Sequence, residues 1–161
     1  MTISNTTNFM SPIGFQFGIS KIPNVGFYSQ RCNLPGLSMT EANQGNPFSD
    51  APVPGDKITW DTFSIDFMID ENMENYMEIY AWLISLGFPR SYTEFTTTNR
   101  LLQMSDGVLQ ILSSNNTVTK TIYFNDMFPV SLNAITFSST ESDVQYIQAT
   151  AEFKYTTFTI E

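Results

Sequence analysis

The side chains best suited to chemistry are few in this chain of 161 residues. It has no histidine and a single cysteine, Cys32, although general acid–base and nucleophilic catalysis rely largely on these two residue types. What remains is a run of carboxylates: Asp61, Asp66, Asp70, Glu71, Glu74 and Glu78. Two carboxylates can hydrolyse a glycosidic bond, but Asp70 and Glu71 are typical of a helix start and Asp66 of the solvent side of a strand. We therefore predict that the protein is not an enzyme.

The sequence also offers no site for a metal or cofactor. It has neither an Asp-x-Asp calcium loop nor a glycine-rich phosphate loop, so we predict no cofactor. A second interpretation of the acidic run is a negative surface that repels phosphate or binds a basic neighbour.

Charge and composition limit the partners. Seven basic and 16 acidic residues give a net charge of −9, which argues against tight nucleic-acid binding, although DNA can pass a wall that repels it. No apolar run approaches a membrane span, and residues 1–8 are polar and lack the basic-then-apolar order of a signal peptide. We therefore expect synthesis in the cytoplasm and no membrane partner. Charged residues make up only 14%, which fits either a surface covered by neighbours or a merely polar β-protein.

Alternating apolar residues predict most of the secondary structure. A strand is expected at 13–20, a hairpin turn at 21–24 around Pro23, and a return strand at 25–33. Later strands are expected at 58–69, 108–112, 118–124, 129–137 and 144–160, with bulges near Asp61 and Thr156 and a tight turn at 114–116.

One helix is predicted over residues 71–86, with Asp70 as its N-cap and Gly87 and Pro89 ending it. Its core-facing stripe is expected to comprise Met73, Tyr76, Met77, Tyr80, Leu83 and Ile84.

Two segments lack such periodicity. Residues 1–11 are polar and are expected to form a flexible arm. Residues 36–57 are rich in Gly and Pro, and a loop of this length is often functional. It is either a mobile surface loop or an arm that reaches a neighbouring subunit. Together these elements predict one domain over residues 1–161, of mainly β or α+β class, built as a sandwich or barrel.

Several short motifs follow one another in a characteristic order along residues 12–161. They are Phe15-Gln16-Phe17 through Gln30-Arg31-Cys32, Leu34-Pro35-Gly36, Pro54-Gly55-Asp56, Trp60 to Ile65, the helix with Trp82, Phe124 to Pro129, and Phe153-Lys154-Tyr155. In this order the chain resembles the tail tube protein family of contractile-tailed bacteriophages.

The resemblance implies both a fold and a role. The expected fold is a small β-sandwich or split barrel with one flanking α-helix and a long arm. The expected assembly is a homohexameric ring, and rings stack into a hollow tube inside the contractile sheath of the virion. Strands of adjacent subunits would join into one barrel around a negatively charged channel for genome DNA. The implied partners are further copies, the tail sheath protein and the tube initiator of the baseplate.

The resemblance also suggests site residues. Candidates for the channel wall are Asp61, Thr62, Ser64, Asp66, Thr150 and Glu152, whereas Lys154 fits an acidic wall poorly. Candidates for arm contacts are Leu37, Met39, Phe48, Val53 and Lys57. The alternatives are a tube initiator or terminator, the tube of an injection device, or a carbohydrate-binding β-sandwich in which Trp60 and several tyrosines stack on sugars.

Overall fold

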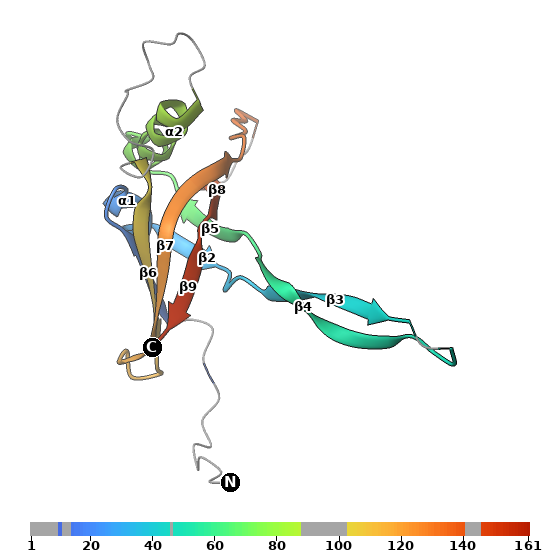
Figure 1. Ribbon diagram of the computed structural model, residues 1–161. Helices are drawn as coiled ribbons and strands as arrows, with labels where there is room; N and C mark the ends of the chain where they lie inside the picture. The colour runs from blue at the N-terminus through green and yellow to red at the C-terminus, as the bar shows by residue number, and fades with distance from the viewer. Residues whose placement is uncertain (1–9, 11–13, 46, 88–102, 141–145) are drawn as a thin grey trace.

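The computed structural model describes residues 10, 14–45, 47–87, 103–140 and 146–161. Its elements are β1 (Phe15–Ile19), α1 (Pro23–Phe27), β2 (Ser29–Cys32), β3 (Leu37–Gln44), β4 (Ala51–Trp60), β5 (Phe63–Met68), α2 (Glu74–Gly87), β6 (Ser105–Leu112), β7 (Val118–Leu132), β8 (Gln148–Lys154) and β9 (Thr157–Ile160) (Figure 1). The expected arm at 1–11 lies almost wholly outside the described residues.

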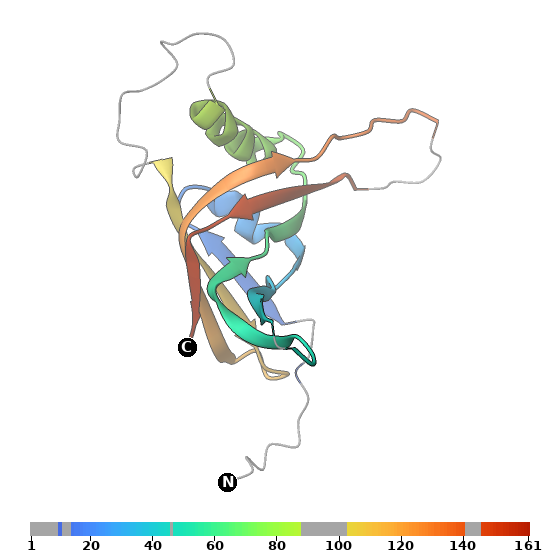
Figure 2. The ribbon, with the colours of Figure 1, turned by 45° about the vertical axis from the view of Figure 1, so that its right-hand side comes forward.

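Strand β7 joins two antiparallel half-sheets. Its first part lies between β6 and β9, and β6 also pairs with β1; this is the first half-sheet. The second part of β7 pairs with β8, and the order continues through β5 to β2; this is the second half-sheet. The two half-sheets face each other as a split sandwich (Figure 2), so the predicted mainly β class is confirmed.

The core between the half-sheets is aromatic. The ring of Phe63 lies 4.9 Å from that of Phe17 and 5.0 Å from that of Phe124, measured between centroids. Phe153 packs against Phe63 and against Trp82 of α2. The predicted alternation is confirmed, because every second residue of β5 and β8 is buried here while the residues between them are not.

The predicted hairpin at residues 21–24 is wrong. Pro23 instead opens the short helix α1, where its fixed φ suits the first turn. Ile22, just before this helix, and Val25, within it, are fully buried. Strands β1 and β2 therefore enter different half-sheets rather than pairing with each other.

Three other strand boundaries also differ from prediction. The segment 58–69 is two strands, because the chain passes from the arm to the body at Asp61. Likewise β8 and β9 are separate strands that pair with different parts of β7, so the predicted bulges near Asp61 and Thr156 are strand breaks. The strands predicted at 118–124 and 129–137 are one continuous strand, β7, which ends at Leu132. The turn at 114–116 is confirmed, with Asn116 at φ 57°.

Helix α2 begins at Glu74, later than predicted, and Asp70 to Met73 form a turn before it. Its buried residues are Asn75, Ile79 and Trp82, whereas Met77 and Tyr80 are exposed, so the predicted stripe was wrong for these two. The buried face includes polar side-chain atoms that hydrogen-bond backbone carbonyls outside the helix. The Asn75 amide donates to the Met68 carbonyl at 2.7 Å, and Trp82 Nε1 donates to the Gln103 carbonyl at 2.7 Å.

Candidate assembly surfaces

The second half-sheet places four of the predicted wall residues side by side. Because the residues between them on β5 and β8 face the core, Ser64, Asp66, Thr150 and Glu152 lie on the opposite side, which we call the outer face. The register sets Ser64 against Glu152 and Asp66 against Thr150. The Thr150 hydroxyl donates to Asp66 Oδ1 at 2.7 Å.

The outer face also carries basic residues. Arg31 of β2 lies opposite Asp66 across the strand pair, and Lys154 lies two residues beyond Glu152 on the same side of β8. Sequence reasoning noted Lys154 but missed Arg31, whose position follows only from the β2–β5 register. Two acidic and two basic side chains thus share this face, so it is mixed in charge rather than uniformly negative.

Asp61 and Thr62 do not join this group. They lie where the arm leaves the body, and their backbone atoms hold that junction. The Asp61 amide donates to the Gly36 carbonyl at 3.1 Å, and the Asp61 carbonyl accepts from the Tyr155 hydroxyl at 2.8 Å. The Thr62 backbone carbonyl accepts a hydrogen bond from the Asn33 side-chain amide at 3.1 Å.

Tyr155 gives this junction a pH dependence. Burial, with a smaller contribution from the Asp61 carboxylate, raises the pKa of Tyr155 from 10.0 to about 12. The protonated phenol therefore stabilises the fold fully below about pH 10, and this contribution is lost as the pH rises through 12.

We expect Tyr155→Phe to lower the free energy of unfolding by about 1 kcal/mol near neutral pH, because the Asp61 carbonyl loses its donor. The variant should also lack the part of the alkaline destabilisation that comes from Tyr155. Urea unfolding between pH 7 and 12 tests both effects. Equal stability of the two proteins at neutral pH would exclude a stabilising role for this hydrogen bond.

The second half-sheet has two open edges. Among the described residues, β2 pairs only with β5, and β7 beyond Met127 pairs only with β8. Unpaired N–H and C=O groups along a strand are a template for another strand. Both edges border the outer face, so strand pairing between copies would extend that face from one copy to the next.

The arm is a β-hairpin, not the loop that the sequence predicted. β3 and β4 pair only with each other among the described residues and project from the body (Figure 1). The five predicted arm residues are all exposed: Leu37, Met39, Phe48, Val53 and Lys57. Leu37 and Met39 share one side of the hairpin with Ile58. A lone two-stranded ribbon is marginal in water, so the arm is well suited to being covered by a partner.

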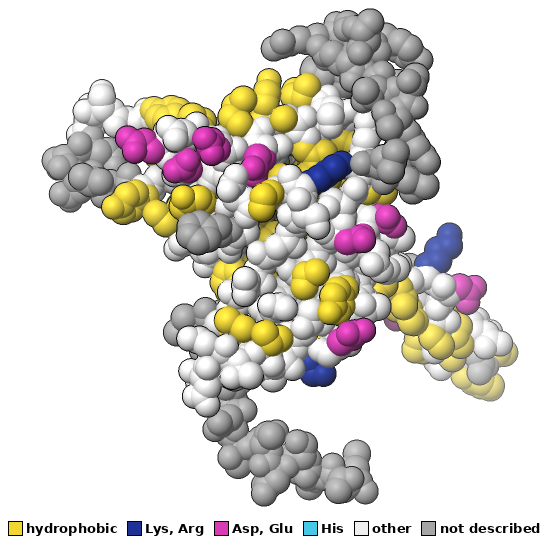
Figure 3. Space-filling view, turned by 90° about the vertical axis from the view of Figure 1, so that its left-hand side faces the viewer, with side chains coloured by type: hydrophobic (Ala, Val, Ile, Leu, Met, Phe, Trp, Pro, Cys, Tyr) yellow, Lys and Arg dark blue, Asp and Glu magenta, His cyan; other side chains and the backbone are white. Residues whose placement is uncertain are grey.

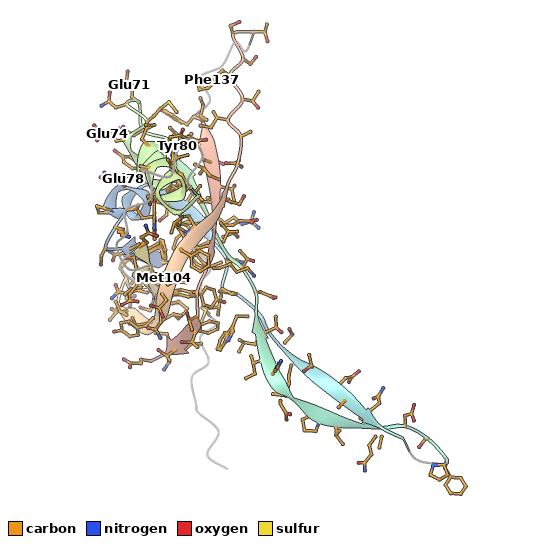
Figure 4. All side chains as sticks on the ribbon, turned by 45° about the horizontal axis from the view of Figure 1, so that its top comes forward. Glu71, Glu74, Glu78, Tyr80, Met104 and Phe137 are labelled. Carbon is orange, nitrogen blue, oxygen red and sulfur yellow. The ribbon has the colours of Figure 1, made fainter. Side chains whose placement is uncertain are left out.

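Helix α2 exposes a different surface. It packs on the core side of the second half-sheet through Ile79 and Trp82, so it lies on the opposite side of that half-sheet from the outer face. Glu71, Glu74 and Glu78 lie along one side of the helix segment (Figure 4). Acidic and apolar side chains gather on the face of the molecule in Figure 3.

The carboxylates of the acidic run are therefore divided. Asp66 belongs to the outer face, Asp61 to the arm junction, Asp70 and Glu71 to the turn before α2, and Glu74 and Glu78 to α2. The pairing of Asp66 with Glu71 that glycoside hydrolysis would need therefore gains no support. Within the described residues no group of His, Cys, Asp or Glu side chains could hold a metal. No helix in the described part of the chain is long and apolar enough to cross a membrane.

Trp60 is the residue that the carbohydrate-binding alternative would use to stack on sugars. It is half-buried, with its ring edge-on to Phe158 at 5.0 Å and to Tyr155 at 6.3 Å between centroids. It thus anchors the root of the arm to the body.

Comparison with known proteins agrees with this architecture. The chain is 26% identical over 163 residues to the tail tube terminator protein of Enterobacteria phage T4, covering 98% of this chain and 89% of that protein. A chain of the extended sheath–tube complex of the PVC extracellular contractile injection system superposes with a TM-score of 0.70 at 11% identity, covering 99% of each chain. The tube-terminating cap of the anti-feeding prophage gives 0.71 at 10% identity, covering 99% of this chain and 95% of that one.

At such low identity the two structural matches show the fold alone. The profile of the phage tail tube protein family, in contrast, matches residues 1–161 in full. This chain therefore belongs to the phage tail tube protein family.

Proposed function

We propose that the protein is a structural subunit that forms a hexameric ring of a contractile phage tail tube. The observation that carries this proposal is the second half-sheet, which has a polar outer face and two open edges. In a ring, β2 of one copy pairs with the second part of β7 of the next. The half-sheets then close into one barrel without exposed edges, and the outer face lines the channel.

The charges of the outer face suit passage of DNA without specific binding. Arg31 and Lys154 balance Asp66 and Glu152, so the wall offers no cluster of positive charge to hold phosphates. The net charge of −9 resides mainly elsewhere on the chain.

The same arrangement orients the rest of the subunit. If the outer face lines the channel, α2 lies on the far side of the half-sheet and points away from the axis, toward the sheath. Glu74 and the exposed Met77 and Tyr80 are then available to the tail sheath protein, whereas Glu78 is half-buried and accepts a hydrogen bond from the Asn24 side-chain amide. The domain spans residues 1–161 and acts in the virion after synthesis in the host cytoplasm.

A second position in the tail is favoured by a specific observation. The relative that matches over 98% of this chain is a tube terminator, and the cap structure shares the fold. In that position one ring of this protein ends the tube, whereas the repeated subunit contributes every ring along it. A role at the baseplate end as initiator gains less support, because it rests on a fold likeness with a TM-score of 0.66 at 12% identity. The carbohydrate-binding alternative loses its main residue with the half-buried Trp60.

Counting copies in purified phage particles separates these positions. Quantitative mass spectrometry against the portal and sheath proteins should give one ring's worth of copies for a terminator and many rings' worth for the repeated subunit. Cryo-electron microscopy of the same particles should place the ring on the tail axis. Absence of the protein from intact tails would overturn the proposal.

A further inference from the structure

The two open edges of the second half-sheet end with the same hydrogen-bond arrangement. Asn33 follows β2: its backbone N–H donates to the Ser64 carbonyl at 3.2 Å, and its side-chain Oδ1 accepts from the Ser64 N–H at 2.6 Å. Asn133 follows β7 and makes the same two bonds to Thr150, at 3.0 and 2.7 Å. In each case a side-chain oxygen replaces the backbone carbonyl of the ladder, so the edge strand ends at a defined residue.

These bonds determine which backbone groups of each edge are free. In an antiparallel ladder, pairs that exchange hydrogen bonds alternate with pairs that do not. Asn33 and Asn133 bond to the interior strands, so the residues before them, Cys32 and Leu132, belong to non-bonded pairs. The N–H and C=O groups of Cys32 and Leu132 therefore point away from the half-sheet, one residue on each open edge.

Each edge is regular over one short segment. The register of β2 shifts just before Arg31, and that of β7 shifts just before Ser131. Residues 31–33 and 131–133 are therefore stretches without a bulge, and each ends at its asparagine. The middle residue of each stretch packs against the core, whereas the residues on either side of it belong to the outer face. The two stretches thus present the same order of faces.

We propose that Cys32 of one copy lies directly opposite Leu132 of the next copy; the inference rests on the proposed ring and gives the register of the strand pair that closes it. Strands β2 and β7 run in opposite directions, because three antiparallel pairs connect them. Copies related by rotation about the channel therefore join antiparallel, through two different edges. Cys32 and Leu132 then exchange both of their free backbone hydrogen bonds.

The outer-face residues also match in this register, because Arg31 lies opposite Asn133 and Asn33 lies opposite Ser131. A slip by one residue would set core-side residues against outer-face residues. A slip by two residues in either direction would shorten the overlap of the two regular stretches and bring a bulge or a strand end into the pair. The proposed register alone aligns both stretches over their full length.

The same register covers exposed apolar surface. Leu34 and Val130 are each 50% exposed in the single copy. Each lies two residues from the proposed central pair, at the end of the ladder where β2 finishes and the second part of β7 begins. The register brings these two side chains together, and their burial adds a hydrophobic contribution to a short ladder.

Native Cys32 allows the register to be measured with single substitutions. The variants are Val130→Cys, Ser131→Cys, Leu132→Cys, Asn133→Cys and Ala134→Cys, each assembled into rings and oxidised with copper phenanthroline. Leu132→Cys should form linked chains, up to a complete ring, about tenfold faster than the other four, because directly paired residues lie within disulfide range. Within one copy the two positions are on opposite edges, about 14 Å apart, so every link joins two copies.

The buried thiol does not bias this comparison. Burial raises the pKa of Cys32 to about 11, which slows its oxidation, but the same thiol reacts in all five variants. The relative rates therefore report the position of the partner cysteine. The unchanged protein, which has Cys32 alone, should form no linked chains.

A charge test uses the proposed pair of Arg31 and Asn133. Asn133→Asp keeps an oxygen for the Thr150 N–H and should lower the concentration needed for assembly about two- to fivefold, whereas Asn133→Lys should raise it by a similar factor. Arg31→Glu should restore assembly of Asn133→Lys. Ser114→Lys on the exposed β6–β7 turn is the control for added charge and should assemble normally. Failure of Arg31→Glu to restore assembly would contradict the register.

The ring and the register fail in different ways. Rings that link fastest through position 130 or 134 refute the register and leave the pairing of the two edges standing. Rings that link through none of the five positions refute the pairing of these edges and leave the ring standing. A protein that forms no rings refutes both proposals.

Discussion

A protein without its arm is expected to fold but to form no rings. Residues 38–59 are replaced by a short Gly-Ser turn between Leu37 and Trp60, which already lie opposite each other. The core lies between the half-sheets and contains no residue of the deleted segment, so the thermal midpoint should change by only a few degrees. The loss of ring formation should be complete. The exposed apolar side chains of the arm have no partner among the described residues of their own copy, so we expect a neighbouring copy to cover them in the ring.

Circular dichroism measures folding, and negative-stain microscopy with sizing chromatography measures assembly. The matched control keeps the hairpin and changes only its exposed apolar side, as Leu37→Ser/Met39→Ser/Ile58→Ser. It should assemble more weakly than the unchanged protein but better than the deletion. Rings of normal size from the deleted protein would show that strand pairing alone closes the ring and that the arm serves another purpose.

The second large effect is expected from Asp66→Lys. The change adds two units of positive charge per copy beside Arg31 and Lys154, and in the proposed ring it would convert a balanced channel wall into a basic one. A wall of this kind holds DNA phosphates by releasing their counterions, so genome transit should slow. We expect tails of normal length and a fall in plaque-forming particles of about tenfold or more, because the effect repeats around every ring.

Asp66→Asn is the matched control, since it removes the carboxylate without adding a positive charge and keeps an oxygen that can accept from Thr150. It should retain nearly normal infectivity. Both variants should unfold within about 1 kcal/mol of the unchanged protein, because only one partly buried hydrogen bond is altered. Full infectivity of Asp66→Lys in well-formed tails would remove the outer face from the channel.

Strand periodicity predicted the parts of the fold that depend on neighbouring residues. The alternation in β5 and β8 correctly predicted their buried faces, and their pairing then brought Ser64 and Glu152 together. Periodicity gives no partner, however, so β1 and β2 were wrongly joined as a hairpin. Arg31 was missed for the same reason, since its place beside Asp66 depends on a register between segments far apart in sequence.

Two other errors concern residue types that usually avoid the environment in which they lie here. Asn75 is buried because its side chain hydrogen-bonds the end of β5, which rotates the buried face of α2 away from Met77 and Tyr80. The arm was predicted as a loop because Pro52 and Pro54 are unusual in strands. Both lie in β4, which has β3 on one side only, and a proline is tolerated on an edge strand.

The order of strands in the second half-sheet determines how early in synthesis its open edges can form. Its interior strand β8 follows β2, β5 and β7 in the chain, and β5 has no bond to β7 until β8 lies between them. A nascent polypeptide on the ribosome therefore cannot complete this half-sheet before residues 148–154 emerge. Such long-range pairing folds slowly, and if the proposed ring closes through this half-sheet, closure waits until each chain is finished.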